Sequence, residues 1–162
     1  MFLADGGRKL KMIRDMTYGG VTMPDVRGVH GSTVILISDW HIEGRLPDGR
    51  CFCIHVKAGF MFDGASIPRA LWRLCGHPLE APRIAAAIAH DWIYASRACA
   101  RADADAIYRE ICRMVGIAWI CRTTEYEVLR WFGWIAWNGH TLNERCFALT
   151  HGAIEFENKK EN

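Results

Sequence analysis

The sequence predicts an α+β fold in which a small antiparallel β-sheet, in the N-terminal half, packs on a three-helix bundle in the C-terminal half. Two observations support this prediction. Residues 32–62 hold two strand-like apolar runs joined by a turn signal, and the chain after residue 82 has apolar side chains at helical spacing. The 162 residues, 51% of them hydrophobic, fit one domain with a sizeable core. We therefore expect residues 1–162 to form a single domain.

The expected sheet lies in residues 31–62. The first run, 32–40, contains Val-Ile-Leu-Ile, and the second covers 51–62. Between them, Asp48-Gly49 favours a hairpin turn, because glycine readily adopts the positive φ of a tight turn. Residues 1–30 are weakly patterned and are expected to form an arm with one short strand.

Residues 63–138 are expected to hold a motif-bearing loop followed by the helices. The loop should contain a short helix near 69–74. The main helices are predicted over 82–97, 102–115 and 124–137. Pro82 suits a first helical turn, Gly116 marks the end of the second helix, and Thr124 to Glu127 matches a capping box, although this third helix can start earlier. Residues 139–162 are expected to form a C-terminal tail, polar and frayed from Phe156 onward.

Charge and composition exclude several classes of protein. The net charge of +2 gives no indication of nucleic-acid binding. The apolar run at 84–89 is far shorter than the roughly 20 residues of a membrane span, and no signal peptide is visible. The seven dispersed cysteines are interpreted as free thiols in a reducing compartment. We interpret Cys51 and Cys53 as small residues of the sheet core rather than as zinc ligands with His55, which would need His41 or His77 as a fourth ligand.

The main candidate site is an apolar helical run, 85–94, that contains His90 and Asp91. Burying such groups costs free energy unless partners satisfy them, so either neighbours pair with them or a function requires them. A histidine acting as a general base needs an acceptor on its second ring nitrogen. The next helix can fold back to supply one, from Asp103 or Asp105. The candidate catalytic residues are therefore His90, Asp105, Asp103 and Tyr94, the last of which lies one turn beyond His90.

Asp91 should face away from His90, because adjacent helical residues are about 100° apart. It could hold calcium or magnesium together with Asp63 or backbone oxygens of residues 59–66, since oxygen ligands suit these ions. The alternative is a buried hydrogen-bond network of His90 and Asp91 that fixes the two helices and the loop. The segment from Asp63 to Ser66 likewise fits either a capped strand-to-helix turn or a loop that serves the site.

Trp131, Trp134 and Trp137, with Phe132, give the last predicted helix a wide aromatic surface. Core packing is one interpretation. Seven tryptophans are many for this length, however, and one small core is not expected to hide them all. A surface for protein partners is the second interpretation.

Several motifs together resemble a family of unknown function encoded by tailed bacteriophages and prophages. They are Phe60-Met-Phe-Asp-Gly-Ala-Ser-Ile-Pro68, Leu71-Trp72, Gly76-His-Pro78, His90-Asp-Trp-Ile-Tyr94, Ala104-Asp105 with Tyr108, and Leu129-Arg-Trp-Phe-Gly-Trp134. The resemblance implies a viral or prophage origin and supplies no chemistry. It places the protein in the virion or the host cytoplasm, with other phage proteins as partners.

The helical His90-Asp91 pair followed by Tyr94 is also similar to phospholipases A2. This similarity implies that His90 activates water, Asp91 holds calcium and Asp105 orients the histidine. The segment 59–64 differs from their glycine loop in its glycine spacing, and Ala87 and Ile93 stand where cysteines flank the histidine in that family.

Two functions are therefore expected. The first is a bacteriophage virion or assembly-associated protein with a buried His/Asp cluster and a Trp-rich docking helix. The alternative is a phage hydrolase with His90 as general base and a divalent cation at Asp91. Solvent access separates them, because a catalytic cluster must open to a pocket and a structural one should be sealed.

Overall fold

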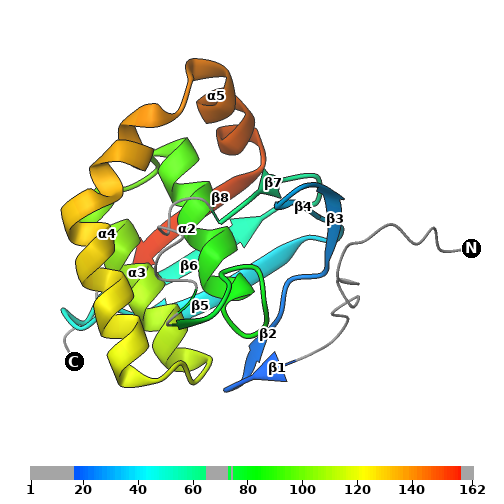
Figure 1. Ribbon diagram of the computed structural model, residues 1–162. Helices are drawn as coiled ribbons and strands as arrows, with labels where there is room; N and C mark the ends of the chain where they lie inside the picture. Colours follow the sequence, from blue (N-terminus) through cyan, green and yellow to red (C-terminus); the bar gives the residue numbers. More distant parts are fainter. Residues whose placement is uncertain (1–16, 65–72, 74, 158–162) are drawn as a thin grey trace, which may run out of the picture.

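The computed structural model describes residues 17–64, 73 and 75–157 (Figure 1). The described helices are α2 (Ile84–Ser96), α3 (Arg101–Met114), α4 (Trp119–Gly139) and α5 (Leu142–Thr150). The strands are β1 (Thr17–Tyr18), β2 (Val21–Thr22), β3 (Val26–His30), β4 (Thr33–Leu36), β5 (Trp40–Arg45), β6 (Cys51–Val56), β7 (Met61–Phe62) and β8 (Gly152–Glu157). This arrangement confirms the α+β class. The predicted count of three helices is wrong, because the described residues contain four.

The strands form three small antiparallel sheets, ordered β1-β2, β3-β4-β7 and β5-β6-β8. The predicted turn at Asp48-Gly49 does join a hairpin, β5–β6, and Gly49 has a φ of +92°. The predicted run 32–40 is not one strand, however. It divides into β4, which pairs with β3 and β7, and the start of β5.

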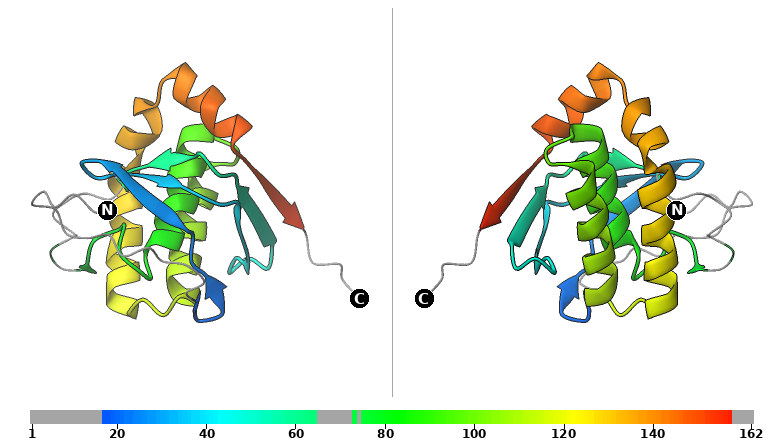
Figure 2. Two further views of the ribbon diagram at one scale, coloured as in Figure 1. Left: turned by 90° about the vertical axis from the view of Figure 1, so that its right-hand side faces the viewer. Right: turned by 90° about the vertical axis from the view of Figure 1, so that its left-hand side faces the viewer.

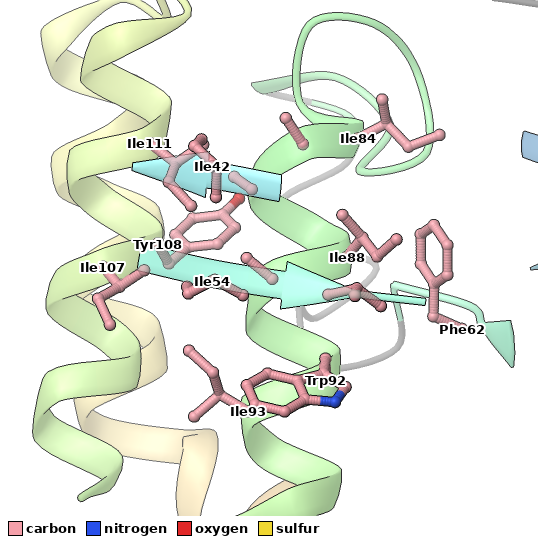
Figure 3. Close-up of a cluster of buried hydrophobic side chains, with 14 of the residues drawn as sticks. Ile42, Ile54, Phe62, Ile84, Ile88, Trp92, Ile93, Ile107, Tyr108 and Ile111 are labelled. Carbon is pink, nitrogen blue, oxygen red and sulfur yellow. The ribbon is translucent and has the colours of Figure 1, made fainter. Parts of the chain in front are cut away.

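The centre of the molecule is α2, whose thirteen residues are all buried. It packs mainly against α3 and α5, and Figure 3 shows isoleucines of α2 and α3 meeting those of β5 and β6. A helix that is hydrophobic all round needs cover on every side. Because α2 is buried over its whole length, His90 and Asp91 lie inside the molecule.

The C-terminal region differs most from its prediction. Helix α4 begins at Trp119, so Thr124 lies inside it and its hydroxyl donates to the Ile120 carbonyl instead of capping a helix. The capping box that forms is Thr141 with Glu144, at the start of α5. The predicted tail is replaced by α5 and β8, and β8 pairs along the whole length of β6. Residues 158–162, part of the predicted frayed segment, lie outside the described residues, as do residues 1–16 of the predicted arm and most of the predicted short helix at 69–74.

Helix α4 lies at the outer edge of the helical layer in Figures 1 and 2, packed on α3 and to a lesser extent on α2. Among the described residues, no helix combines the length and apolar character needed to cross a bilayer.

Candidate functional site

The carboxylate of Asp105, on α3, is the centre of a buried polar cluster. Its Oδ1 accepts the Tyr94 hydroxyl at 2.5 Å and lies 3.3 Å from Nε2 of His90. Its Oδ2 accepts from Nη1 of Arg130 at 2.8 Å and from Nη1 of Arg101 at 3.2 Å. Three helices therefore meet at one fully buried carboxylate, because α2 and α4 each send side chains to α3.

His90 is sealed inside this cluster and is only 1% exposed. Its ring lies against the Tyr94 ring at a centroid distance of 3.9 Å and meets the Tyr108 ring edge-on at 5.3 Å. Nδ1 is buried and has no hydrogen-bond partner among the described residues. The histidine and its carboxylate have the geometry of a base and its orienting acid, but the described residues leave His90 no open approach for a substrate.

The surroundings of Asp105 and Tyr94 determine the charge of these two side chains. Burial raises the pKa of Asp105, but hydrogen bonds from His90, Tyr94 and Arg130 outweigh it and hold the pKa below its usual value. Burial, with the adjacent Asp105 carboxylate, raises the pKa of Tyr94 well above its usual value. Asp105 is therefore ionised and Tyr94 is a neutral donor near neutral pH, which suits a stable network better than proton transfer by Tyr94.

Asp103, the other predicted orienter, does not reach this cluster. It lies on another side of α3 and pairs with Nη2 of Arg50 at 2.6 Å, next to the β5–β6 turn. Of the two alternatives, the structure brings only Asp105 to His90.

Asp91 faces another part of the molecule. Its Oδ2 accepts the backbone N–H of Gly64 at 2.8 Å, so the glycine loop offers Asp91 an amide donor at this point. Gly64 has a φ of +68°, and an added Cβ would lie 2.9 Å from the Pro78 ring. These contacts tie Gly64 to α2. Ser66 and the helix that the turn was predicted to cap lie outside the described residues, so both interpretations of the segment stay predictions.

A pocket of about 490 Å³ opens next to Asp91, between β7, α2 and the α4–α5 corner. Asp63 and Asp91 both line it, with apolar walls that include Phe60, Phe62 and Phe147. Among the described residues, no group of three or more His, Cys, Asp or Glu side chains is placed to hold a metal ion. The Gly64 amide occupies one carboxylate oxygen of Asp91, and a calcium or magnesium ion at Asp91 and Asp63 stays a prediction.

Replacement of Asp91 by alanine is expected to lower the free energy of unfolding by about 1–3 kcal/mol, because the buried Gly64 amide loses its acceptor. Urea unfolding of both proteins measures this difference. Thermal melts of the wild type with and without calcium or magnesium provide the control for a cation. A rise in melting temperature that depends on the ion in the wild type, and is lost in the variant, would contradict a purely structural Asp91.

The region that holds these networks matches the model of a known protein family. The family described as "Protein of unknown function (DUF1353)" matches residues 39–129, more than half of the chain. The chain belongs to the DUF1353 family. No curated protein and no solved structure matches it.

The part of the chain shared with the DUF1353 family contains Asp63, His90, Asp91, Asp103 and Asp105. It ends just before Arg130, a residue that the sequence analysis missed together with Arg101. Arg130 is the second residue of the motif Leu129–Trp134, and Arg101 is four residues before Asp105, a spacing typical of helical ion pairs. No local sequence pattern indicates that Arg130 lies opposite Asp105.

A second buried network was also missed. Glu125, on α4, is 1% exposed and accepts from Nε of Arg83 and from the Tyr108 hydroxyl, each at 3.1 Å. Burial raises the pKa of Glu125 despite its contacts with Arg83 and Tyr108. The apolar sequence around Tyr108 gave no indication of this network, which ties α4 to the start of α2.

The interpretation of the strand cysteines as core residues is wrong. Cys51 and Cys53 are half-buried, and the exposed His55 lies on the same outer face of β6. Nε2 of His55 is 3.2 Å from Sγ of Cys53, and the His41 ring stacks on His55. The inward positions of β6 are its apolar ones, Phe52, Ile54 and Val56. All seven cysteines are free thiols in the structure.

The aromatic surface predicted on the last helix is divided by the packing of α4. Trp131, Phe132 and Trp134 are exposed, together with Ile135. Trp137 instead faces inward, where its ring meets Tyr94 edge-on and its carbonyl accepts from Arg97. The exposed aromatic residues lie beyond the matched family region.

Proposed function

We propose that this DUF1353 chain is a bacteriophage-encoded protein of the virion or of its assembly, in which the His90 cluster is structural and the exposed face of α4 binds another protein. The observation that carries the proposal is a contrast in exposure. His90 is 1% exposed, whereas Trp131 is 73% exposed on the outer face of α4.

The buried cluster supports the structural part of the proposal. Asp105 is bound by four donor side chains from three helices, which leaves little capacity for a substrate. A satisfied network of this kind rigidifies a core and fixes how its helices pack. The phage origin rests on the motif resemblance. We propose the virion or the host cytoplasm as the location of the protein on the same basis.

The surface of α4 supports the docking part. Large exposed aromatic side chains are unfavourable in water and are enriched at the centre of protein interfaces. Trp131, Phe132 and Trp134 form such a group on one helix. A partner protein would cover them, and loss of these side chains should weaken its binding.

The test follows the protein in phage particles produced with tagged wild-type or variant chains. Replacing Trp131 and Trp134 together by alanine is expected to lower the recovery of the protein with particles or assembly intermediates by tenfold or more, since central aromatic residues dominate interface energies. Trp119→Ala is the matched control, because Trp119 is 64% exposed, a value between those of Trp131 and Trp134, but lies at the far end of α4. Absence of the wild-type protein from particles and intermediates would contradict the proposal.

A phage hydrolase is the second candidate, favoured by one observation. His90 Nε2 lies within 3.3 Å of Asp105, and no described residue gives Nδ1 a hydrogen-bond partner, which is the state expected of a base that accepts a proton from water. A local opening between α2 and its cover would be needed to admit a substrate. The class of substrate would be an ester, following the similarity to phospholipases A2.

The hydrolase is tested with His90→Gln and the wild type against a panel of phospholipid and simple carboxylic esters. A general base contributes about 10²–10⁴-fold in rate, so a loss of that size in a folded variant would support the hydrolase. We expect no His90-dependent hydrolysis and an effect of the variant on stability alone. The far-ultraviolet circular dichroism and melting temperature of each variant show whether it is folded.

A further inference from the structure

The exposed face of α4 carries a regular seam. Its members are Ile120, Thr124, Glu127, Trp131, Trp134 and Asn138, all of them exposed. They recur at alternating steps of four and three residues, which is the 3.5-residue spacing by which one helix packs along another. In a 21-residue helix this seam runs for nearly the full length of about 30 Å.

The apolar area of the exposed face of α4, which includes residues beside the seam, is that of an interface. Trp131, Phe132, Trp134 and Ile135 are 73%, 57%, 54% and 58% exposed. With about 150–250 Å² for each large side chain, they leave about 500 Å² of apolar surface in water. Two such surfaces together cover about 1,000 Å², and the flanking seam residues raise the total towards the 1,200–2,000 Å² of stable protein interfaces.

We propose that the occupant of this face is a second copy of the chain, packed through α4 in an antiparallel, two-fold symmetric pair. The inference rests on the proposed docking role of α4 and names its partner. In this register Trp131 lies opposite Trp134 of the second copy, and Glu127 lies opposite Asn138. A parallel pair would instead place Glu127 against Glu127, and like charges directly opposite are destabilising.

The composition of the face favours a second copy over a membrane surface. Exposed residues of α4 include Glu127 and no lysine or arginine. Surfaces that bind anionic lipid carry clusters of basic residues around their apolar groups. Interfaces between identical subunits are more apolar than other protein interfaces, which fits the group from Trp131 to Ile135.

The experiment is sedimentation equilibrium of the full chain over a hundredfold range of concentration. The wild type is expected to reach twice the 18.4 kDa chain mass. The double variant Trp131→Glu/Trp134→Glu should be monomeric and should keep the far-ultraviolet circular dichroism spectrum of the wild type, because both side chains point to solvent within one chain. Trp119→Glu, which is 64% exposed but off the seam, should remain dimeric.

Position 138 tests the register. Asn138→Lys should tighten the dimer several-fold by facing Glu127 of the second copy, and Asn138→Glu should weaken it. Equal effects of these two variants would overturn the antiparallel arrangement, and a wild type that stays monomeric would overturn the dimer.

A monomer that sediments with phospholipid vesicles would assign the face to lipid instead. Particle association measures the proposed function separately, so a monomer found in particles refutes only the dimer, and a dimer absent from particles refutes only the function.

Discussion

Replacement of Asp105 by alanine is expected to lower the free energy of unfolding by about 3 kcal/mol, the lower end of the cost of breaking a buried ion pair. The carboxylate is fully buried and holds side chains from α2, α3 and α4. The lower end applies because Arg101 and Arg130 are partly exposed, so water can satisfy them after the change. Urea unfolding at neutral pH measures the difference.

Asp103→Ala is the matched control on the same helix. Asp103 pairs with Arg50, and both side chains are partly open to solvent, so the expected cost is below about 1 kcal/mol. Asp105→Asn keeps the shape of the side chain and provides a variant that folds if the alanine protein does not. Equal costs for Asp103→Ala and Asp105→Ala would show that the buried cluster has no special role in stability.

Low pH should remove the stabilisation of the folded state that Asp105 provides. The pKa of Asp105 is lower in the folded protein than its usual value, so the unfolded chain binds its proton first as the pH falls. The stabilisation is complete above about pH 4, the ordinary range of an aspartate, and is lost below it. The raised pKa of Glu125 acts in the opposite sense, but it is common to both proteins. The difference in stability between wild type and Asp105→Asn should therefore shrink as the pH falls below 4.

Gly133→Ala is expected to destabilise the protein by about 1–3 kcal/mol, as overpacking of a close-packed core does. Gly133 is the point where α4 lies against α2. A Cβ there would overlap the Tyr94 hydroxyl and lie 3.3 Å from Nη1 of Arg101. The clash should exceed the gain of roughly 1 kcal/mol in helix propensity that alanine brings. Thermal and urea unfolding measure the net effect.

Two further variants isolate the cause. In Gly139→Ala, at the end of the same helix, the new Cβ meets no atom of the described residues within 4 Å, so the variant should be neutral or slightly stabilising. Tyr94→Phe removes the oxygen that the new Cβ would strike, so Gly133→Ala should cost much less in that background. An unchanged cost in the double-mutant cycle would rule out contact with Tyr94 as the reason.

The local sequence was sufficient for the parts of the site that depend on short-range spacing. The connection between α2 and α3 is short, which predicts that His90 faces an acidic residue near the start of α3, and Asp105 lies there at 3.3 Å. The sequence left Asp103 and Asp105 as alternatives. They flank opposite sides of the apolar face of α3, so spacing cannot show which side α4 covers and which side the Arg50 turn covers.

The aromatic residues of α4 illustrate the same limit. Helical spacing predicts which of Trp131, Trp134 and Trp137 share a face, but it does not determine which face meets the core. In the structure Gly133 lies against Tyr94 on the buried face of α4, Trp137 is turned inward, and Trp131 and Trp134 are turned outward.

The sequence by itself determined the α+β class, the β5–β6 turn, the three helices α2, α3 and α4 in outline, and the His90–Asp105 neighbourhood. These features depend on turn chemistry and on periodicity within about 20 residues. Only the tertiary structure decided that β8 joins β6, that Arg130 completes the Asp105 cluster and that Asp91 binds the Gly64 amide. Each of these joins residues at least 25 positions apart, and such contacts form because buried polar groups and strand edges require partners, wherever in the chain those partners lie.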